Sequence, residues 1–279
     1  MVRFYCDVYR KKDGSGYRIT YTTDGEDFRY TDSPTEIPVG RGDQVFMDVL
    51  PIIHTDGLIE LLRRGVEVYY LRRLTMIKKT REKLGVKSKS AKTDIRVLMA
   101  IEDKWFRRVD EDYLVMRRVV STFHSLQRTL QQYQNRVSAA SEDEREDIQD
   151  LIRVTEVKIE RLARRIIEEA GKRYPAYNTI IEALGISDNN HLMGRESLAE
   201  LMIHLSRSTS YHGLRRFLGL FKARKGREKF YNKTARTALV RLTSAILENP
   251  KHRARDEEKL LKRIWRIAKK PQERLRVPA

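Results

Sequence analysis

The chain has 279 residues, of which 40% are hydrophobic, so it is long enough to bury a core in one large domain or two ordinary ones. No run of about 18 apolar residues occurs, and no charged start precedes an apolar stretch, so we expect neither a membrane span nor a secretory signal. The single cysteine, Cys6, excludes a disulfide within the chain. We therefore expect a soluble cytoplasmic protein in a reducing, intracellular compartment, with no membrane partner.

The charge is strongly positive and unevenly distributed. The formal net charge is +18, and residues 205–279 carry 22 Lys and Arg against 6 Asp and Glu. The preceding 204 residues carry 35 against 33. A surplus that served only solubility would be spread evenly, so this concentration predicts a polyanionic partner. Nucleic acid is favoured as that partner over a membrane surface. A DNA-bound protein of this kind would be associated with the nucleoid.

The first 71 residues alternate between apolar and polar side chains in short runs separated by Gly, Pro and Asp. One stretch, residues 55–65, instead has the apolar spacing of a helix and closes on Gly65. The predicted order is four strands, a helix and a fifth strand, which favours a mixed sheet in an α/β domain. The predicted strands are residues 2–10, 16–23, 27–33, 43–49 and 66–71.

Helices are predicted from residue 74 onward. A helix ending at Gly85 and a basic linker, residues 86–92, precede a helix over 93–106 with Thr93 at its N-cap position. Two long helices, 110–139 and 143–170, have apolar residues three or four apart and predict an antiparallel coiled-coil hairpin that could mediate homo-oligomers. The predicted domains are 1–109 (α/β), 110–170 (hairpin), 171–250 (small all-α) and 251–279 (basic helix and tail).

Three aspartates are candidates for chemistry. Asp7 is expected at the end of the first predicted strand, Asp48 at the end of the fourth, and Asp94 in the first turn of a later helix. Carboxylates gathered at strand ends of a mixed sheet are ligands for the paired Mg²⁺ ions of nucleases. Each acid also has a simpler, structural explanation. Asp94 can be a charge at a helix start, where the helix dipole favours acids, and Asp48 can be a turn residue before Pro51.

The spacing of these acids carries a resemblance to a known family. The stretch "YCDVYRKK" contains Asp7, and "DVLPIIHTDGLIELLRRGVEV" places Gly65 seventeen residues after Asp48 and Val68 three beyond it. These motifs resemble insertion-sequence transposases that carry a RuvC-like DEDD catalytic domain, relatives of the Piv-type DNA invertases. The resemblance implies an RNase H-like or RuvC-like fold for the first domain, and Asp7 and Asp48 as its first two catalytic carboxylates.

The third motif of that family is similar to "KTDIRVLMA", which implies Asp94 as the third catalytic carboxylate. The family's fourth acid would stand three residues later, where this chain has Val97. The nearest later acids, Glu102 and Asp103, are candidate replacements among the metal ligands. If the site is catalytic, Mg²⁺ or Mn²⁺ is the expected cofactor, and otherwise none is expected.

The resemblance continues into the last third of the chain. The family places a coiled-coil segment next and then a small helix-hairpin-helix-like transposase domain, whose Gly-Leu and terminal Arg elements correspond to Gly219, Leu220 and Arg236. The family's Ser-Gly, with its nucleophilic serine, is replaced by the sequence Arg-Lys-Gly-Arg at 224–227, which offers neither a hydroxyl nor a thiol.

Cations in this basic segment are the predicted contacts to a nucleic-acid backbone, and nearby aromatic residues suit core packing better than base stacking. Lys87, Lys89 and Lys92 of the linker could hold a strand over the carboxylates, or could simply be solvated. DNA is expected before RNA, and a guide RNA is compatible with the family. The predicted nucleic-acid-binding residues are Arg215, Arg216, Lys222, Arg224, Lys225, Arg227, Lys229, Lys233 and Arg236.

Three hypotheses follow for the whole protein. The first is a nucleic-acid-binding protein related to DEDD transposases, acting in DNA recombination or transposition with impaired catalysis. The second is an active Mg-dependent nuclease or recombinase that uses Asp7, Asp48 and Asp94. The third is a coiled-coil assembly scaffold built on the hairpin.

Overall fold

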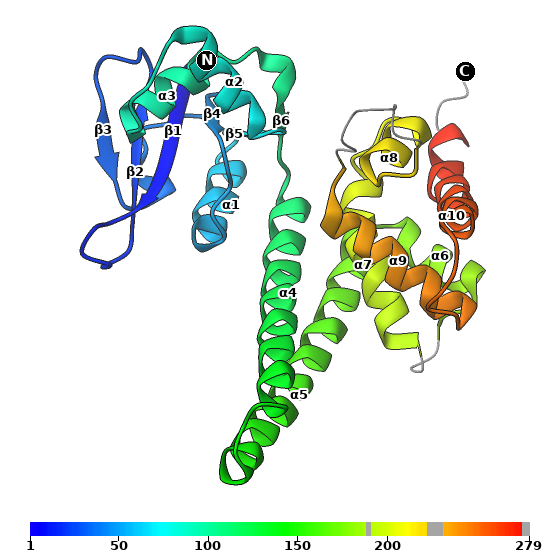
Figure 1. Ribbon diagram of the computed structural model, residues 1–279. Helices are drawn as coiled ribbons and strands as arrows, with labels where there is room; N and C mark the ends of the chain where they lie inside the picture. Colours follow the sequence, from blue (N-terminus) through cyan, green and yellow to red (C-terminus); the bar gives the residue numbers. More distant parts are fainter. Residues whose placement is uncertain (188–190, 222–230, 275–279) are drawn as a thin grey trace. The chain divides into compact units, whose positions relative to one another are not determined.

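The computed structural model describes residues 1–187, 191–221 and 231–274 (Figure 1). The chain divides into two compact units, unit 1 with residues 1–118 and unit 2 with residues 119–279. Unit 1 contains a six-stranded mixed sheet, and the described part of unit 2 is helical. The predicted succession of an α/β region and an all-helical region is thereby confirmed, whereas the boundaries between the four predicted domains stay predictions.

The sheet of unit 1 has the order β3-β2-β1-β4-β5-β6. Its first three strands form an antiparallel meander, and β4 and β5 run parallel to β1. The last strand, β6, is antiparallel to β5. The strands are β1 (Arg3–Arg10), β2 (Tyr17–Thr22), β3 (Arg29–Thr31), β4 (Gln44–Met47), β5 (Glu67–Leu71) and β6 (Phe106–Arg108).

Strand alternation divides the core of unit 1 into two clusters, one on each face of the sheet. Phe4 and Cys6 of β1 pack in the cluster that contains α1 (Thr55–Arg63) and the first turns of α4 (Glu111–Val137). Tyr5 packs on the opposite face, where α3 (Ala91–Met99) contributes Ile95, and α2 (Thr75–Leu84) lies against the same cluster. Side chains at odd positions of β1 therefore face α2 and α3.

Two predictions in this unit are wrong in detail. The helix expected over 93–106 ends at Met99, and the segment beyond it forms β6, whose backbone bonds to β5 replace helical ones. The N-cap of that helix is Ser90 and not Thr93, because the Ser90 hydroxyl accepts a hydrogen bond from the Thr93 backbone N–H at 3.2 Å. A nonlocal strand pairing and a cap three residues earlier thus override the local pattern.

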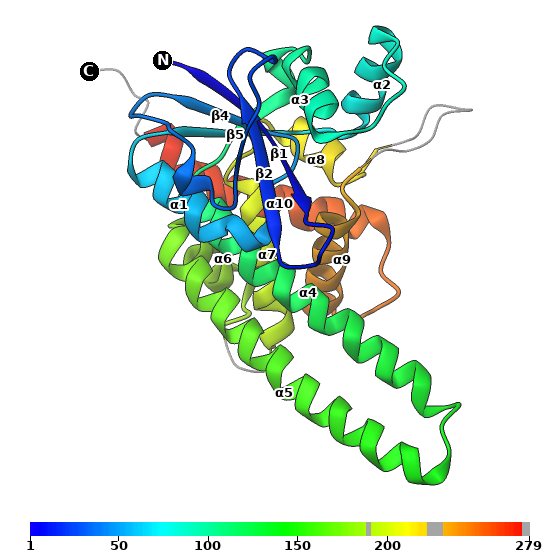
Figure 2. The ribbon, with the colours of Figure 1, turned by 90° about the vertical axis from the view of Figure 1, so that its left-hand side faces the viewer.

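Unit 2 contains the predicted hairpin, formed by α4 from Val119 onward and by α5 (Glu142–Arg173), which run alongside each other in both views (Figures 1 and 2). The turn between them ends in a capping box, in which Ser141 and Glu144 exchange hydrogen bonds. The remaining helices are α6 (Ala176–Leu184), α7 (Leu192–Leu205), α8 (Tyr211–Phe217), α9 (Lys233–Leu247) and α10 (Ala254–Arg274).

Helix α7 forms the centre of this helical core, since ten of its fourteen residues are buried. It packs against α5, α6 and α9, and α10 packs against α6, α8 and α9. In the part of the chain that the structure describes, no helix has the length and apolar character needed to cross a membrane.

Candidate functional site

Asp7 and Asp48 occupy equivalent positions on neighbouring parallel strands. Cys6 of β1 pairs with Met47 of β4, so each aspartate directly follows a paired residue. Both side chains extend from the sheet face covered by α2 and α3, because Cys6 and Met47 belong to the opposite cluster. The structure therefore brings these two predicted carboxylates together, where the hydrogen-bonded pairing of β4 with β1 ends.

The two carboxylates carry unbalanced negative charge. Burial, and then the neighbouring charge of Asp48, raise the pKa of Asp7 to about 6. Burial also raises the pKa of Asp48, against a hydrogen bond that its Oδ1 accepts from the Val49 N–H at 2.6 Å. A pair of half-buried acids that resist ionisation is typical of functional sites.

A buried hydroxyl lies next to the pair. Thr20 of β2 stands directly opposite Asp7 in the antiparallel ladder, so their side chains share one face of the sheet. Its Oγ1 is fully buried and has no hydrogen-bond partner within the described chain. An unsatisfied oxygen beside two carboxylates suits a cationic or hydrogen-bonding ligand.

The third predicted acid, Asp94, is held by a cation. Its carboxylate forms an ion pair with Arg81 of α2, and both side chains are largely shielded from solvent. The positive charge of Arg81 also lowers the pKa of Asp7, as does that of Lys89 in the basic linker. Asp94 is thus connected to the acid pair through Arg81, and Lys89 lies close enough to act on the same group.

The two replacement ligands lie elsewhere. Asp103 forms a bidentate ion pair with Arg3, with N–O distances of 3.1 and 2.9 Å, and Arg3 is about 13 Å from Asp7 along β1. Glu102 is exposed and pairs with Lys104 at 2.5 Å. Both were predicted as metal ligands, but the chain turns into β6 after α3 and carries them to the far end of the sheet.

These placements limit the metal site that the unit can form. Among the described residues, no three His, Cys, Asp or Glu side chains are grouped closely enough to hold a metal ion. Asp7 and Asp48 supply oxygen ligands that suit one hard cation, whereas Asp94 is paired with Arg81 and Val97, in the place of the fourth acid, is fully buried. The residues fit a single-cation site better than a two-ion site.

The predicted nucleic-acid contacts separate into three groups. Arg215 and Arg236 form ion pairs with Glu258 and Glu257 of α10, at 2.8 and 2.5 Å. Arg216 and Lys233 are exposed. The other five lie outside the described residues: Lys222, Arg224, Lys225, Arg227 and Lys229.

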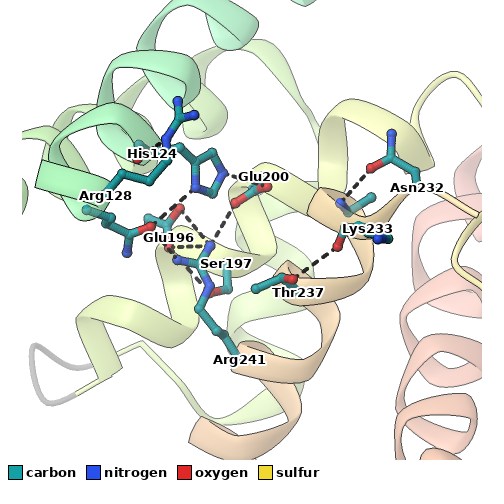
Figure 3. Close-up of polar contacts among 11 residues, drawn as sticks. His124, Arg128, Glu196, Ser197, Glu200, Asn232, Lys233, Thr237 and Arg241 are labelled. Atoms are coloured by element: carbon teal, nitrogen blue, oxygen red, sulfur yellow. Dashed lines mark hydrogen bonds and ion pairs between the residues drawn. The ribbon is translucent and has the colours of Figure 1, made fainter. Parts of the chain in front are cut away.

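Unit 2 contains a second group of ionisable side chains, which no sequence pattern indicated (Figure 3). Glu196 and Glu200, one turn apart on α7, are almost completely buried. Arg241 of α9 reaches both, at 3.2 Å from Glu196 and 2.7 Å from Glu200. His124 of α4 contacts Glu200 at 3.0 Å through Nε2.

This network is charge-balanced. The hydrogen bond that His124 Nε2–H donates to the Glu200 carboxylate raises the pKa of His124. Burial raises the pKa of Glu196 to about 7, although the charge of Arg241 opposes the shift. The guanidinium also lies 5.7 Å from the centroid of the Phe123 ring. Two acids matched by an arginine and a histidine join α4, α7 and α9, which indicates a structural role.

Sequence reasoning missed Arg81, Thr20 and this whole network. Arg81 belongs to a run of cations on α2 that resembles any solvated helix face. Glu196 and Glu200 have the spacing of an ordinary exposed helix pair, and His124 shows no partner in the sequence. A signal exists only for Thr20, because an alternating strand predicts that it faces the same side as its cross-strand partner.

In comparisons with known proteins, no family model and no curated protein matches this chain. Membership of the transposase family therefore stays a prediction that depends on the motifs.

Proposed function

We propose that this chain is a nucleic-acid-binding protein, with DNA preferred to RNA, that acts in recombination or transposition and is related to DEDD transposases. The observation that carries the proposal is the charge distribution: residues 205–279 hold 22 Lys and Arg against 6 Asp and Glu. Such a surface attracts phosphate backbones and releases their counterions on binding.

We further propose an RNase H-like or RuvC-like fold for unit 1. Its mixed sheet, with three antiparallel strands followed by two strands parallel to β1, supports this assignment. The neighbouring positions of Asp7 and Asp48 on parallel strands support it as well. Impaired catalysis is part of the proposal, because Asp94 is held by Arg81 and Val97 faces the interior.

The proposal is tested by fluorescence anisotropy with labelled single-stranded, duplex and branched DNA and with RNA of the same sequences. We expect binding that weakens steeply with salt, and the same affinity in the double variant Asp7→Asn, Asp48→Asn within threefold. We expect no cleavage with Mg²⁺ or Mn²⁺ under saturating conditions. Affinity that is indifferent to ionic strength would contradict nucleic-acid binding.

An active nuclease is the second candidate, and the raised pKa of Asp7 beside Asp48 favours it. A bound divalent cation would supply Lewis-acid stabilisation of a phosphodiester oxygen. Asp7 and Asp48 would hold that cation, and Arg81 would stabilise additional negative charge beside it. Cleavage that appears with Mg²⁺ and disappears in Asp7→Asn would establish this candidate in place of impaired catalysis.

An assembly role for the hairpin is the third candidate. Leu151, Val154 and Val157 of α5 expose between 47% and 63% of their surface, which is unusual for large apolar side chains on one short stretch of helix. Mass measurement in solution at high protein concentration tests it, and a monomer at all concentrations would contradict it.

A further inference from the structure

Helix α10 presents a single row of cations to solvent. Arg255, Lys259, Lys262 and Arg266 follow one another at intervals of four, three and four residues, and all four are exposed. This spacing keeps them on one face of a helix with 3.6 residues per turn. The row extends from Arg255 to Arg266, which are eleven residue steps or about 16 Å apart along the helix axis.

Two acids at the start of α10 are paired with cations outside the helix. Glu257 is buried and forms ion pairs with Arg236 at 2.5 Å and His252 at 3.3 Å. Glu258 pairs with Arg215 at 2.8 Å. Glu257 and Glu258 thus hold α10 against α8 and α9, and the remaining acid at the start of the helix, Asp256, accepts a hydrogen bond from the Arg253 backbone N–H at 3.1 Å.

The opposite face of α10 is closed. Leu261 and Ile264 are completely buried, and Trp265 contacts the Tyr211 ring of α8 at a centroid distance of 6.1 Å. An amphipathic helix that binds a lipid surface inserts its apolar face between the headgroups. Since the apolar side of α10 packs inside unit 2, the exposed row suits a polyanion and not a membrane.

Within the described chain, none of the four cations of the row has an ion-pair partner. Four uncompensated charges along 16 Å match a partner whose own charges repeat at short, regular intervals. A nucleic-acid backbone is such a partner, because duplex DNA carries one negative charge per about 1.7 Å of its axis.

We propose that this row on α10, referred to as the α10 row, is a main contact surface for the phosphodiester backbone. The proposal rests on the proposed function and names the surface that performs it. Arg215 and Arg236, which the sequence placed among the backbone contacts, instead position α10 through Glu258 and Glu257. Their effect on binding is therefore indirect, through the placement of the α10 row.

The test compares two quadruple variants of the full chain. The first replaces the α10 row: Arg255→Gln, Lys259→Gln, Lys262→Gln and Arg266→Gln. The matched control removes the same charge from exposed positions of α4 and α5: Arg136→Gln, Lys158→Gln, Arg161→Gln and Arg165→Gln. Binding of a fluorescent DNA is measured by anisotropy from 50 to 300 mM salt, thermal unfolding of each variant verifies the fold, and anionic lipid vesicles serve as a second probe.

We expect the first variant to bind about 100-fold more weakly at low salt, and its slope of log affinity against log salt to fall by about three. The control should change the affinity less than tenfold. Equal losses in both variants would overturn the α10 proposal while leaving nucleic-acid binding in place, since wild type still binds. Absence of DNA binding by wild type would overturn the proposed function itself, and vesicle binding through the α10 row would show that its ligand is a lipid surface.

Discussion

Each unit of this protein shields two neighbouring carboxylates from water, but the two pairs are compensated in different ways. In unit 1, the negative charge of Asp48 raises the pKa of Asp7, and the cations Arg81 and Lys89 act on Asp7 through their charge without a hydrogen bond to it. In unit 2, Glu196 and Glu200 contact Arg241 directly, and His124 bonds to Glu200. The same chemical groups therefore indicate two different roles.

Burial alone does not distinguish a functional carboxylate from a structural one, whereas the presence or absence of a directly paired cation does. A buried acid with a matched cation costs little in the folded state and fixes how helices meet. A pair of acids left without a direct cation keeps a free-energy cost that a ligand could relieve. The balance of charge, more than the raised pKa shared by Asp7 and Glu196, distinguishes the two sites.

The largest effect is expected from Arg241→Met. This change leaves Glu196 and Glu200 buried without their cation, and we expect unit 2 to lose about 3 kcal/mol of stability. Thermal unfolding and hydrogen exchange of α7 amides measure the loss. The triple variant Arg241→Met, Glu196→Gln, Glu200→Gln should recover at least half of the lost stability. A triple variant as unstable as the single one would show that the unpaired carboxylates are not the cause of the loss.

Asp7→Asn should stabilise unit 1 by about 2 kcal/mol at pH 7.5. The folded chain binds the Asp7 proton more tightly than the unfolded chain, so the ionised carboxylate costs free energy once the pH exceeds about 6. Hydrogen exchange of β1 amides measures the gain, which should vanish below the ordinary pKa of 3.8, where the carboxyl is protonated in both states. Destabilisation at pH 7.5 would show that Asp7 is a structural partner like Glu200.

The pH dependence of unit 2 should have a defined sign. The folded state raises the pKa of Glu196 to about 7 and raises that of His124, so it holds more protons than the unfolded state. The Glu196 contribution to stability is complete below pH 4.5 and is lost as the pH rises through about 7. The His124 contribution is complete below pH 6.5 and is lost as the pH rises through its raised pKa.

The melting temperature of unit 2 should consequently decrease between pH 5.5 and 8.5. The variant Glu196→Gln should flatten the lower part of this decrease, and His124→Gln the upper part. Melting temperatures that rise with pH in this window would be inconsistent with the network as described.

The smallest effect concerns the coupling between the two acids of unit 1. In Asp48→Asn the pKa of Asp7 should fall toward its ordinary value but stay above it, because burial is the larger cause of the shift. Carboxyl chemical shifts followed by NMR during a pH titration measure the change. Thr20→Val serves as a control that keeps the shape of the site and leaves both charges in place.

Much of the local structure could be predicted from the residues. Alternation identified β1 to β5, and the three- and four-residue apolar spacing identified α4 and α5. Gly85 closes α2 as expected, with a positive φ of 67° that glycine adopts without strain. Asp48 follows the end of β4 as predicted, whereas the expected position of Asp7 at the end of its strand is wrong, because β1 continues to Arg10 in its pairing with β2.

Other features depended on packing. The three residues of β6 became a strand because β5 offered them an unpaired edge. Arg81 forms an ion pair with Asp94. Arg215 and Arg236 form ion pairs with acids of α10 and are not free to contact a ligand in solution. Glu196, Glu200, Arg241 and His124 meet only because α4, α7 and α9 pack together.

Local patterns in the sequence establish the order of strands and helices along the chain and the concentration of positive charge in residues 205–279. Which of the charges are neutralised and which stay exposed depends on how the folded segments pack. Alternation and helical periodicity are properties of neighbouring residues, whereas the partner of a charge is selected by the packing of segments that lie 13 to 76 residues apart in these pairs.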